Sequence, residues 1–205
     1  KHVGYGGARG GGKSWSGRRK GVMLCMRYDG LKVLLLEADL RRPTIGSKLR
    51  VRSVPGLTNL LVSDARLQSL VRRCEVAPDM DIITAGDIPP NPSELLGSKR
   101  METTLKSLAE HFDYIVLDLP PVNIVSDALA VSKYIDGMIV VIREEYTEKK
   151  ELETCFRQLR LSNVNVLGCV MNETKNGKGY YSKYRYKRYY RYYKTYGNYA
   201  PADNK

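Results

Sequence analysis

Five apolar runs along the chain have the length of strands and are separated by segments with helical spacing. They are Lys32–Leu36, Asp81–Ile83, Tyr114–Leu117, Met138–Ile142 and Val164–Asn172. Apolar residues mostly follow one another within these runs instead of alternating with polar ones. This pattern is typical of parallel strands that are covered on both faces of a sheet.

Two of the intervening segments show the four-and-three spacing of amphipathic helices. A helix capped by Ser93, directly after Pro92, places on one face the residues Met101, Leu105, Leu108 and Phe112. A second helix, opened by Thr147, repeats this spacing at Leu152, Phe156 and Leu159. Strands that alternate with helices predict an α/β fold, in which a doubly wound, mainly parallel sheet has helices on both faces.

The net charge of +12 on this 205-residue chain is concentrated at its two ends. Residues 1–20 hold six Lys and Arg and no acid, residues 175–199 hold eight and no acid, and the remainder carries −2. With 42% hydrophobic residues the chain can form a core, which excludes wholesale disorder. No apolar run has the length of a membrane span, and four widely spaced cysteines with two histidines indicate neither a zinc site nor a disulfide framework. These features favour a reduced, cytoplasmic compartment.

A Gly-rich segment from Gly7 to Ser14 fits the pattern G-x-x-x-x-G-K-[ST]. In that pattern backbone N–H groups cradle phosphates, the lysine reaches the β- and γ-phosphates, and the serine hydroxyl binds Mg²⁺. The residues assigned to this role are Gly10, Gly11, Gly12, Lys13 and Ser14. Because eight glycines lie within residues 1–21, this segment alone leaves open a flexible Gly-rich stretch with a chance match.

Charged residues follow two of the predicted strands at their carboxyl ends, where open α/β sheets bind ligands. Glu37, Asp39 and Arg41 follow the first apolar run, and Asp118 follows the third. A carboxylate there can hold the Mg²⁺ shell or orient a hydroxyl, and an arginine can neutralise developing phosphate charge. Each taken alone could be a solvated turn residue. Together with the Gly-rich match they have the order and spacing of a P-loop nucleotide enzyme that uses ATP and Mg²⁺.

Four further features occur together: Ala38-Asp39-Leu40-Arg41-Arg42-Pro43, Ile88-Pro-Pro-Asn-Pro-Ser-Glu-Leu-Leu96, Asp118-Leu-Pro-Pro121 with Ser126-Asp127-Ala128-Leu129, and a cluster of tyrosines near the end of the chain. Through them the chain resembles the bacterial tyrosine kinases (BY-kinases) of capsular and exopolysaccharide biosynthesis. These CpsD/CapB-like proteins belong to the MinD/ParA-related P-loop class. The resemblance covers roughly residues 30–199.

The resemblance implies a role for each matching position. Lys13 and Ser14 bind phosphate and Mg²⁺, Asp39 and Asp118 organise the metal and the attacking hydroxyl, and Asn172 contacts adenine. The catalytic group implied is Lys13, Glu37, Asp39, Arg41 and Asp118, and the metal ligands are Ser14, Asp39 and Asp118.

The chain departs from the family at position 37, where Glu37 stands in place of the usual Asp. The implied domain organisation is a P-loop kinase domain over residues 1–174, whose first strand is degenerate or truncated, followed by a flexible basic tail over residues 175–205.

Tyrosine and basic residues interleave in this tail, which allows two interpretations. In isolation the pattern could bind single-stranded nucleic acid through phosphate contacts and base stacking. Attached to a kinase-like body, the tyrosines are predicted to be phosphoacceptors: Tyr180, Tyr181, Tyr184, Tyr186, Tyr189, Tyr190, Tyr192, Tyr193, Tyr196 and Tyr199. From Asn176 to Tyr199 the extended chain reaches about 80 Å, against a radius of gyration of roughly 16 Å for the body. Phosphorylation in trans is therefore geometrically easy.

The chain is thus expected to be an ATP-dependent protein-tyrosine kinase that autophosphorylates its tail and regulates capsular or exopolysaccharide synthesis or export. The resemblance implies a homo-oligomer, other protein substrates, and a membrane-bound polysaccharide co-polymerase or activator that holds the chain at the inner face of the membrane. One alternative is a MinD/ParA-like ATPase switch, although Ala8 stands where that class usually has a lysine. Another is a non-catalytic binding module with a decayed nucleotide site.

Overall fold

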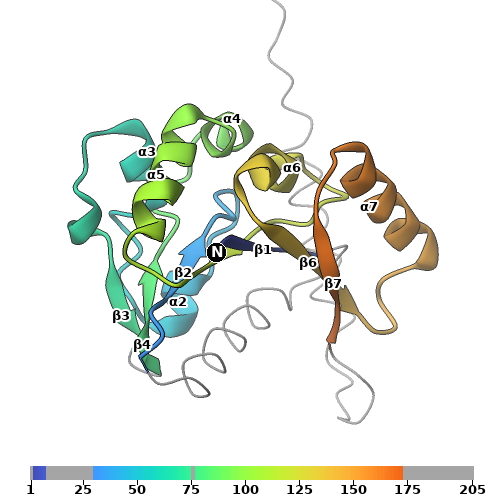
Figure 1. Ribbon diagram of the computed structural model, residues 1–205, viewed down its shortest axis with the longest axis horizontal. Helices are drawn as coiled ribbons and strands as arrows, with labels where there is room; N and C mark the ends of the chain where they lie inside the picture. The colour runs from blue at the N-terminus through green and yellow to red at the C-terminus, as the bar shows by residue number, and fades with distance from the viewer. Residues whose placement is uncertain (1, 8–29, 75–76, 173–205) are drawn as a thin grey trace, which may run out of the picture.

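The computed structural model describes residues 2–7, 30–74 and 77–172, and within them one mixed sheet with helices packed on it (Figure 1). The strands are β1 (His2–Gly7), β2 (Val33–Glu37), β3 (Arg72–Cys74), β4 (Ala77–Ile83), β5 (Tyr114–Asp118), β6 (Gly137–Arg143) and β7 (Val166–Asn172). The helices are α2 (Ile45–Leu49), α3 (Leu57–Val62), α4 (Pro92–Leu96), α5 (Lys99–Ala109), α6 (Asp127–Val131) and α7 (Lys149–Leu161), with 3-10 turns η1 (Leu67–Ser69) and η2 (Ser132–Tyr134).

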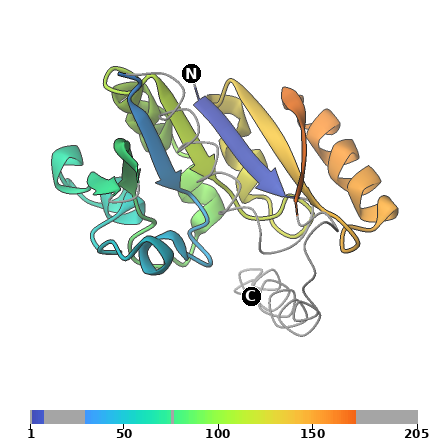
Figure 2. The same cartoon turned by 90° about the horizontal axis from the view of Figure 1, so that it is seen from below.

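The strand order is β3-β4-β2-β5-β1-β6-β7, and every described pairing is parallel except that of β3 with β4. From β1 the chain continues to β2, then to β3 at one edge and β4 beside it, returns to β5 next to β1, and finally forms β6 and β7 on the other side. Figure 2 shows β1 in the middle of the sheet, next to β6. The carboxyl end of β1 therefore lies at the point where the strand order changes direction, where such sheets bind ligands.

Successive residues of β2 pack into two separate cores, one on each face of the sheet. Leu34 and Leu36 join a large cluster with residues of α3, α4, α5, α6 and α7. Val33 and Leu35 join a smaller cluster that includes Ile45 of α2. Figure 1 accordingly shows α4, α5 and α6 on the opposite side of the sheet from α2. This arrangement confirms the predicted doubly wound α/β fold with helices on both faces.

The single long helix predicted after Pro92 is wrong, because two helices occupy the segment. Helix α4 ends at Leu96, and the Ser98 hydroxyl accepts a bond from the Met101 amide to cap a new helix, α5. Ser93 lies inside α4 and caps nothing. The apolar stripe is real, since Met101 and Leu105 are buried, but Phe112 lies beyond the end of α5.

The second predicted helix begins two residues later than expected, at Lys149. The Thr147 hydroxyl accepts a hydrogen bond from the Arg143 amide at 3.1 Å, so it closes the preceding turn, and Glu148 stands at the cap position. Strand β7 also differs from the expectation of full coverage. It lies at the edge of the sheet, with Leu167 and Met171 more than half exposed.

None of the helices in the described part of the chain is long and apolar enough to cross a membrane.

Candidate active site

Acidic residues gather at the carboxyl ends of β2 and β5, beside the end of β1. Glu37 and Asp118 are neighbours in the parallel register of these two strands, and Asp118 also pairs with Tyr5 of β1. The Ala38 amide donates to the Asp118 carbonyl at 3.0 Å, which holds the start of the following loop against β5. The topology therefore places this acidic edge beside the carboxyl end of β1, whose last residue, Gly7, is the first of the Gly-rich pattern in the sequence.

The Glu37 carboxylate is almost fully buried and accepts three backbone hydrogen bonds. Oε1 accepts from the amides of Thr44 at 2.5 Å and Ile45 at 2.6 Å, where α2 begins, and Oε2 accepts from the amide of Ala85 at 3.1 Å, just after β4. Burial raises the pKa of this carboxyl above its ordinary value, the three amides oppose that rise, and the charge of Asp118 adds to it. These contacts make Glu37 a clamp between three elements. Its predicted contact with substrate stays a prediction.

The segment after β4, whose Ala85 amide bonds Glu37, is itself tightly packed against α3. The amides of Leu57 and Thr58 at the start of α3 donate to the carbonyls of Thr84 and Ala85, both at 2.8 Å. Gly86 has a φ of +81°, and a Cβ there would lie 2.5 Å from the Asn59 Oδ1 atom. Only glycine fits such a backbone comfortably, so the segment that holds Glu37 has little freedom to move.

Asp39 and Asp118 could each supply a carboxylate oxygen to a magnesium ion. Both side chains are buried, with exposed fractions of 5% and 3%, and the Arg42 amide donates to Asp39 Oδ1 at 3.1 Å. Mg²⁺ is usually bound by one or two carboxylates together with substrate phosphates and water. The described residues hold no group of three His, Cys, Asp or Glu that could form an all-protein cage. The pair therefore fits a magnesium ion shared with a nucleotide.

The sequence predicts that Arg41 contacts phosphate, whereas in the structure its side chain bonds Asp127 and Ser93. Its Nε and Nη2 atoms donate to the two carboxylate oxygens of Asp127 at 2.8 and 2.9 Å. Nη2 also lies 3.2 Å from the Ser93 hydroxyl. These donors are engaged by α4 and α6, and the contact of Arg41 with phosphate stays a prediction.

The other half of the carboxyl edge, on β6 and β7, carries an asparagine, an arginine and a tyrosine beside two glutamates, Glu144 and Glu145. Asn172 ends β7 opposite Arg143 in the register, and its carbonyl accepts the Glu144 amide at 3.0 Å. The Arg143 guanidinium is buried and lies 3.9 Å from the centroid of the Tyr146 ring. Carboxylates thus follow strands on both sides of β1, and the side of β6 and β7 adds an Asn-Arg-Tyr group.

The structure brings together Glu37, Asp39, Arg41 and Asp118 on one side of β1 and places Asn172 on the other. The phosphate-loop residues Gly10, Gly11, Gly12, Lys13 and Ser14 and all ten tail tyrosines lie outside the described residues. Sequence reasoning gave Ser93 only the role of a helix cap and gave Asp127 and Ser126 none, although each lies within a motif of the family resemblance. The sequence signal that could have identified them is the presence of charged and hydroxyl side chains within those motifs.

The fold defines the class of the protein first. The MinC:MinD cell division complex of Aquifex aeolicus superimposes with a TM-score of 0.70 at 18% identity, covering 85% of this chain and 69% of that chain. A cobyrinic acid a,c-diamide synthase from Mycobacterium smegmatis, solved with an ATP analog and magnesium, gives the same score and identity, covering 83% of this chain and 72% of its own. The chain has the fold of the MinD-related P-loop NTPases.

Closer relatives define the family. The chain is 33% identical over 175 residues to the tyrosine-protein kinase YwqD of Bacillus subtilis, which covers 85% of this chain and 72% of that protein. The kinase domain of the Escherichia coli tyrosine kinase ETK gives a TM-score of 0.81 at 30% identity, covering 88% of this chain and 71% of that chain. The chain belongs to the family of bacterial tyrosine-protein kinases of capsule and exopolysaccharide loci, and the predicted enzyme class is confirmed.

Relatives in this family differ greatly in length. The chain is 35% identical over 150 residues to the tyrosine-protein kinase ptk of Acinetobacter johnsonii, which is 73% of this chain but only 20% of that protein. It therefore spans about a fifth of that relative and about seven tenths of YwqD. No protein-family model matches the chain.

Proposed function

We propose that this chain transfers the γ-phosphoryl group of ATP to tyrosines of its own residues 175–205. One observation carries the proposal. Two buried carboxylates, Asp39 and Asp118, stand at the ends of adjacent strands beside β1, which leads directly into the segment with the phosphate-loop pattern. Phosphoryl transfer needs positioning and charge neutralisation more than covalent chemistry from the protein, and this edge of the sheet can supply both.

Each residue has a defined task in this proposal. Lys13 binds the transferring phosphoryl group, and Ser14, Asp39 and Asp118 hold Mg²⁺, which when bound neutralises charge on the triphosphate. A tyrosine hydroxyl has a pKa near 10, so Asp39 orients it and accepts its proton as the phenolic oxygen bonds to the γ-phosphorus. The bond from that phosphorus to the bridging oxygen breaks, and ADP leaves.

The acceptors are the ten tail tyrosines, reached in trans. Each phosphate adds about −1.5 to −2 charges, so phosphorylation reverses the charge of a segment that holds eight Lys and Arg and no acid over residues 175–199. We propose that this reversal changes assembly of a homo-oligomer at the inner face of the membrane. A membrane-bound polysaccharide co-polymerase or activator would hold the chain there and couple it to capsular or exopolysaccharide synthesis or export.

Incubating the purified chain with Mg²⁺ and γ-labelled ATP tests the proposal, and mass spectrometry locates the label. Label on tail tyrosines is expected. A mixture of active chain with a Lys13→Met chain of different mass tests transfer in trans, since label must appear on the Lys13→Met chain. Free phosphate without label would support an ATPase switch instead, and no nucleotide binding would support a binding module.

Replacing Asn172 by alanine will weaken ATP binding about tenfold, because the loss of one or two hydrogen bonds to the base removes roughly 1 to 1.5 kcal/mol. Binding of inorganic tripolyphosphate, which has no base, will not change. Isothermal calorimetry with both ligands measures the difference. Asn165→Ala is the matched control, because Asn165 precedes β7 and its side-chain amide donates to the Asp136 carbonyl at 2.7 Å, while its backbone bond from the Met138 amide is kept in the variant. Equal weakening for both ligands would contradict the assignment of Asn172 to the base.

A further inference from the structure

We infer that Asp127 is a positioning residue that acts through Arg41 to hold Asp39 in place. The inference rests on the proposed function, because it explains how the loop that carries Asp39 keeps its geometry. This loop, residues 38–44, runs from the end of β2 to the start of α2. Ala38 and Leu40 are fully buried in the large core and hold the apolar side of this loop. The polar contacts of Arg41 and Arg42 therefore set where the Asp39 carboxylate lies.

Arg41 and Asp127 form a bidentate ion pair that is largely buried. Nε and Nη2 of Arg41 donate to Oδ2 and Oδ1 of Asp127 at 2.8 and 2.9 Å. The Asp127 side chain is fully buried and that of Arg41 is 16% exposed. Paired parallel bonds of this kind fix the orientation of the guanidinium as well as its distance. The contact therefore fixes the position of Arg41 relative to α6.

Two hydroxyls extend this pair to a second helix. The Ser93 hydroxyl in α4 donates to Asp127 Oδ1 at 2.5 Å and accepts from Arg41 Nη2 at 3.2 Å. The hydroxyl of Ser126, at the cap position of α6, lies 3.2 Å from that of Ser93. The first turns of α4 and α6 are thus both hydrogen-bonded to the guanidinium of Arg41. This gives a structural role to the motifs that contain Ser93 and Asp127, to which the family resemblance assigned none.

Arg41 lies close to the catalytic carboxylate in the chain. The amide of the next residue, Arg42, donates to Asp39 Oδ1 at 3.1 Å. The other end of the loop is held by Glu37, which accepts the amides of Thr44 and Ile45. Asp39 therefore sits between two anchors, one formed by Glu37 and one by the Arg41–Asp127 pair. Loss of either anchor lets the carboxylate shift, and a shift near 1 Å at a reacting group lowers rates by about 10²-fold.

Stability and positioning can be separated at this pair. Removing one partner of a buried ion pair is strongly destabilising, whereas replacing both by apolar residues is often neutral or stabilising. The variants are Asp127→Leu, Arg41→Met and the double variant, with Asp64→Leu as the control. Asp64 is the fully exposed partner of another arginine, Arg100, at 3.3 Å. The measurements are the urea midpoint, steady-state kinetics of the full chain, and hydrogen exchange of the Arg42 amide by NMR.

We expect both single variants to lower the urea midpoint and the double variant to restore it. In the double variant kcat will stay about 10²-fold below that of the unmodified chain, KM for ATP will change less than about twofold, and exchange of the Arg42 amide will stay faster. Asp64→Leu will leave all three unchanged. If the double variant regains both kcat and slow exchange, the pair only stabilises the fold and the inference is wrong. If the unmodified chain transfers no phosphate, the proposed function fails, and the Arg42 exchange alone still decides this inference.

Discussion

Replacing Asp39 by asparagine will lower kcat for tyrosine phosphorylation about 10³-fold, within the range that a positioned base contributes. The amide has nearly the same shape and keeps an oxygen that can accept from the Arg42 amide, as Asp39 Oδ1 does at 3.1 Å. The change therefore removes charge and basicity while leaving the loop folded. The apparent affinity for Mg²⁺ will also fall, whereas ADP binding without Mg²⁺ and the thermal midpoint will change little.

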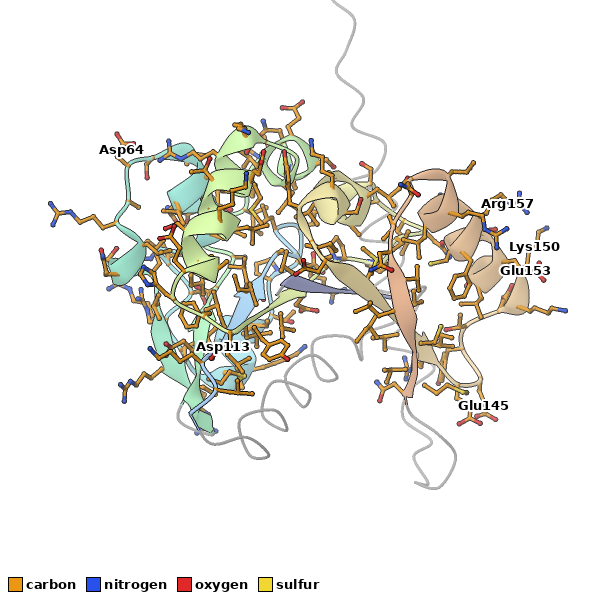
Figure 3. All side chains as sticks on the ribbon, in the orientation of Figure 1. Asp64, Asp113, Glu145, Lys150, Glu153 and Arg157 are labelled. Atoms are coloured by element: carbon orange, nitrogen blue, oxygen red, sulfur yellow. The ribbon has the colours of Figure 1, made fainter. Side chains whose placement is uncertain are left out.

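Single-turnover kinetics over a range of Mg²⁺ concentrations separates the two roles of Asp39. A rate that returns to normal at high Mg²⁺ would mean that Asp39 only binds metal and is not the base. Asp64→Asn is the matched control, since Figure 3 shows Asp64 at the outside of the molecule on the loop after α3, and its side chain is fully exposed. A rate loss of similar size in that control would contradict the assignment of the effect to the site.

Replacing Glu37 by alanine will destabilise the fold by about 4 kcal/mol, because it leaves three buried amide donors without their acceptor at roughly 1–3 kcal/mol each. Such a loss is a large fraction of the stability of an ordinary domain, and it will lower the melting temperature by roughly 10 °C. Glu37→Gln will lose less, since its carbonyl oxygen can still accept from Thr44 and Ile45 while its amide group faces the Ala85 amide.

Thermal and urea unfolding measure this series, with Glu153→Ala as the control. Glu153 lies on α7, where Figure 3 shows it beside Lys150 and Arg157 on the face away from the sheet, and more than half of its side chain is exposed. That control should unfold like the unmodified chain. If Glu37→Ala unfolds like Glu153→Ala while kcat falls, then Glu37 is a catalytic group and not a clamp.

The strands of the sheet were predictable because burial on both faces demands continuous apolar runs. Runs such as Tyr114–Leu117 and Met138–Ile142 became β5 and β6 almost unchanged. Two strands lack this signal. β3 is a short antiparallel strand at the sheet edge and carries two arginines, and β1 contains three glycines, yet it pairs on both sides. Their positions depend on neighbours distant in sequence, which local composition does not encode.

In the candidate site, too, some residues could be predicted from local sequence and others could not. Residues at strand ends, such as Asp39 and Asp118, could be found because the end of a buried strand is visible in sequence. The partners of Arg41 and Glu37 could not, since Asp127 lies 86 positions from Arg41 and Ala85 lies 48 from Glu37. The predicted single helix after Pro92 failed for a local reason, because Ser98 offers a second cap that competes with helix continuation.

The central place of β1 has a consequence for the order of events during synthesis. His2 pairs with Ile115 and Gly7 with Val141, so β1 is made before both of its described neighbours, and the partner residue of His2 lies more than a hundred positions later. Long-range pairings of this kind form late because they close large loops. A nascent chain will therefore carry β1 and the Gly-rich sequence after it early, but β1 will gain its neighbours in the sheet only after β5 and β6 emerge.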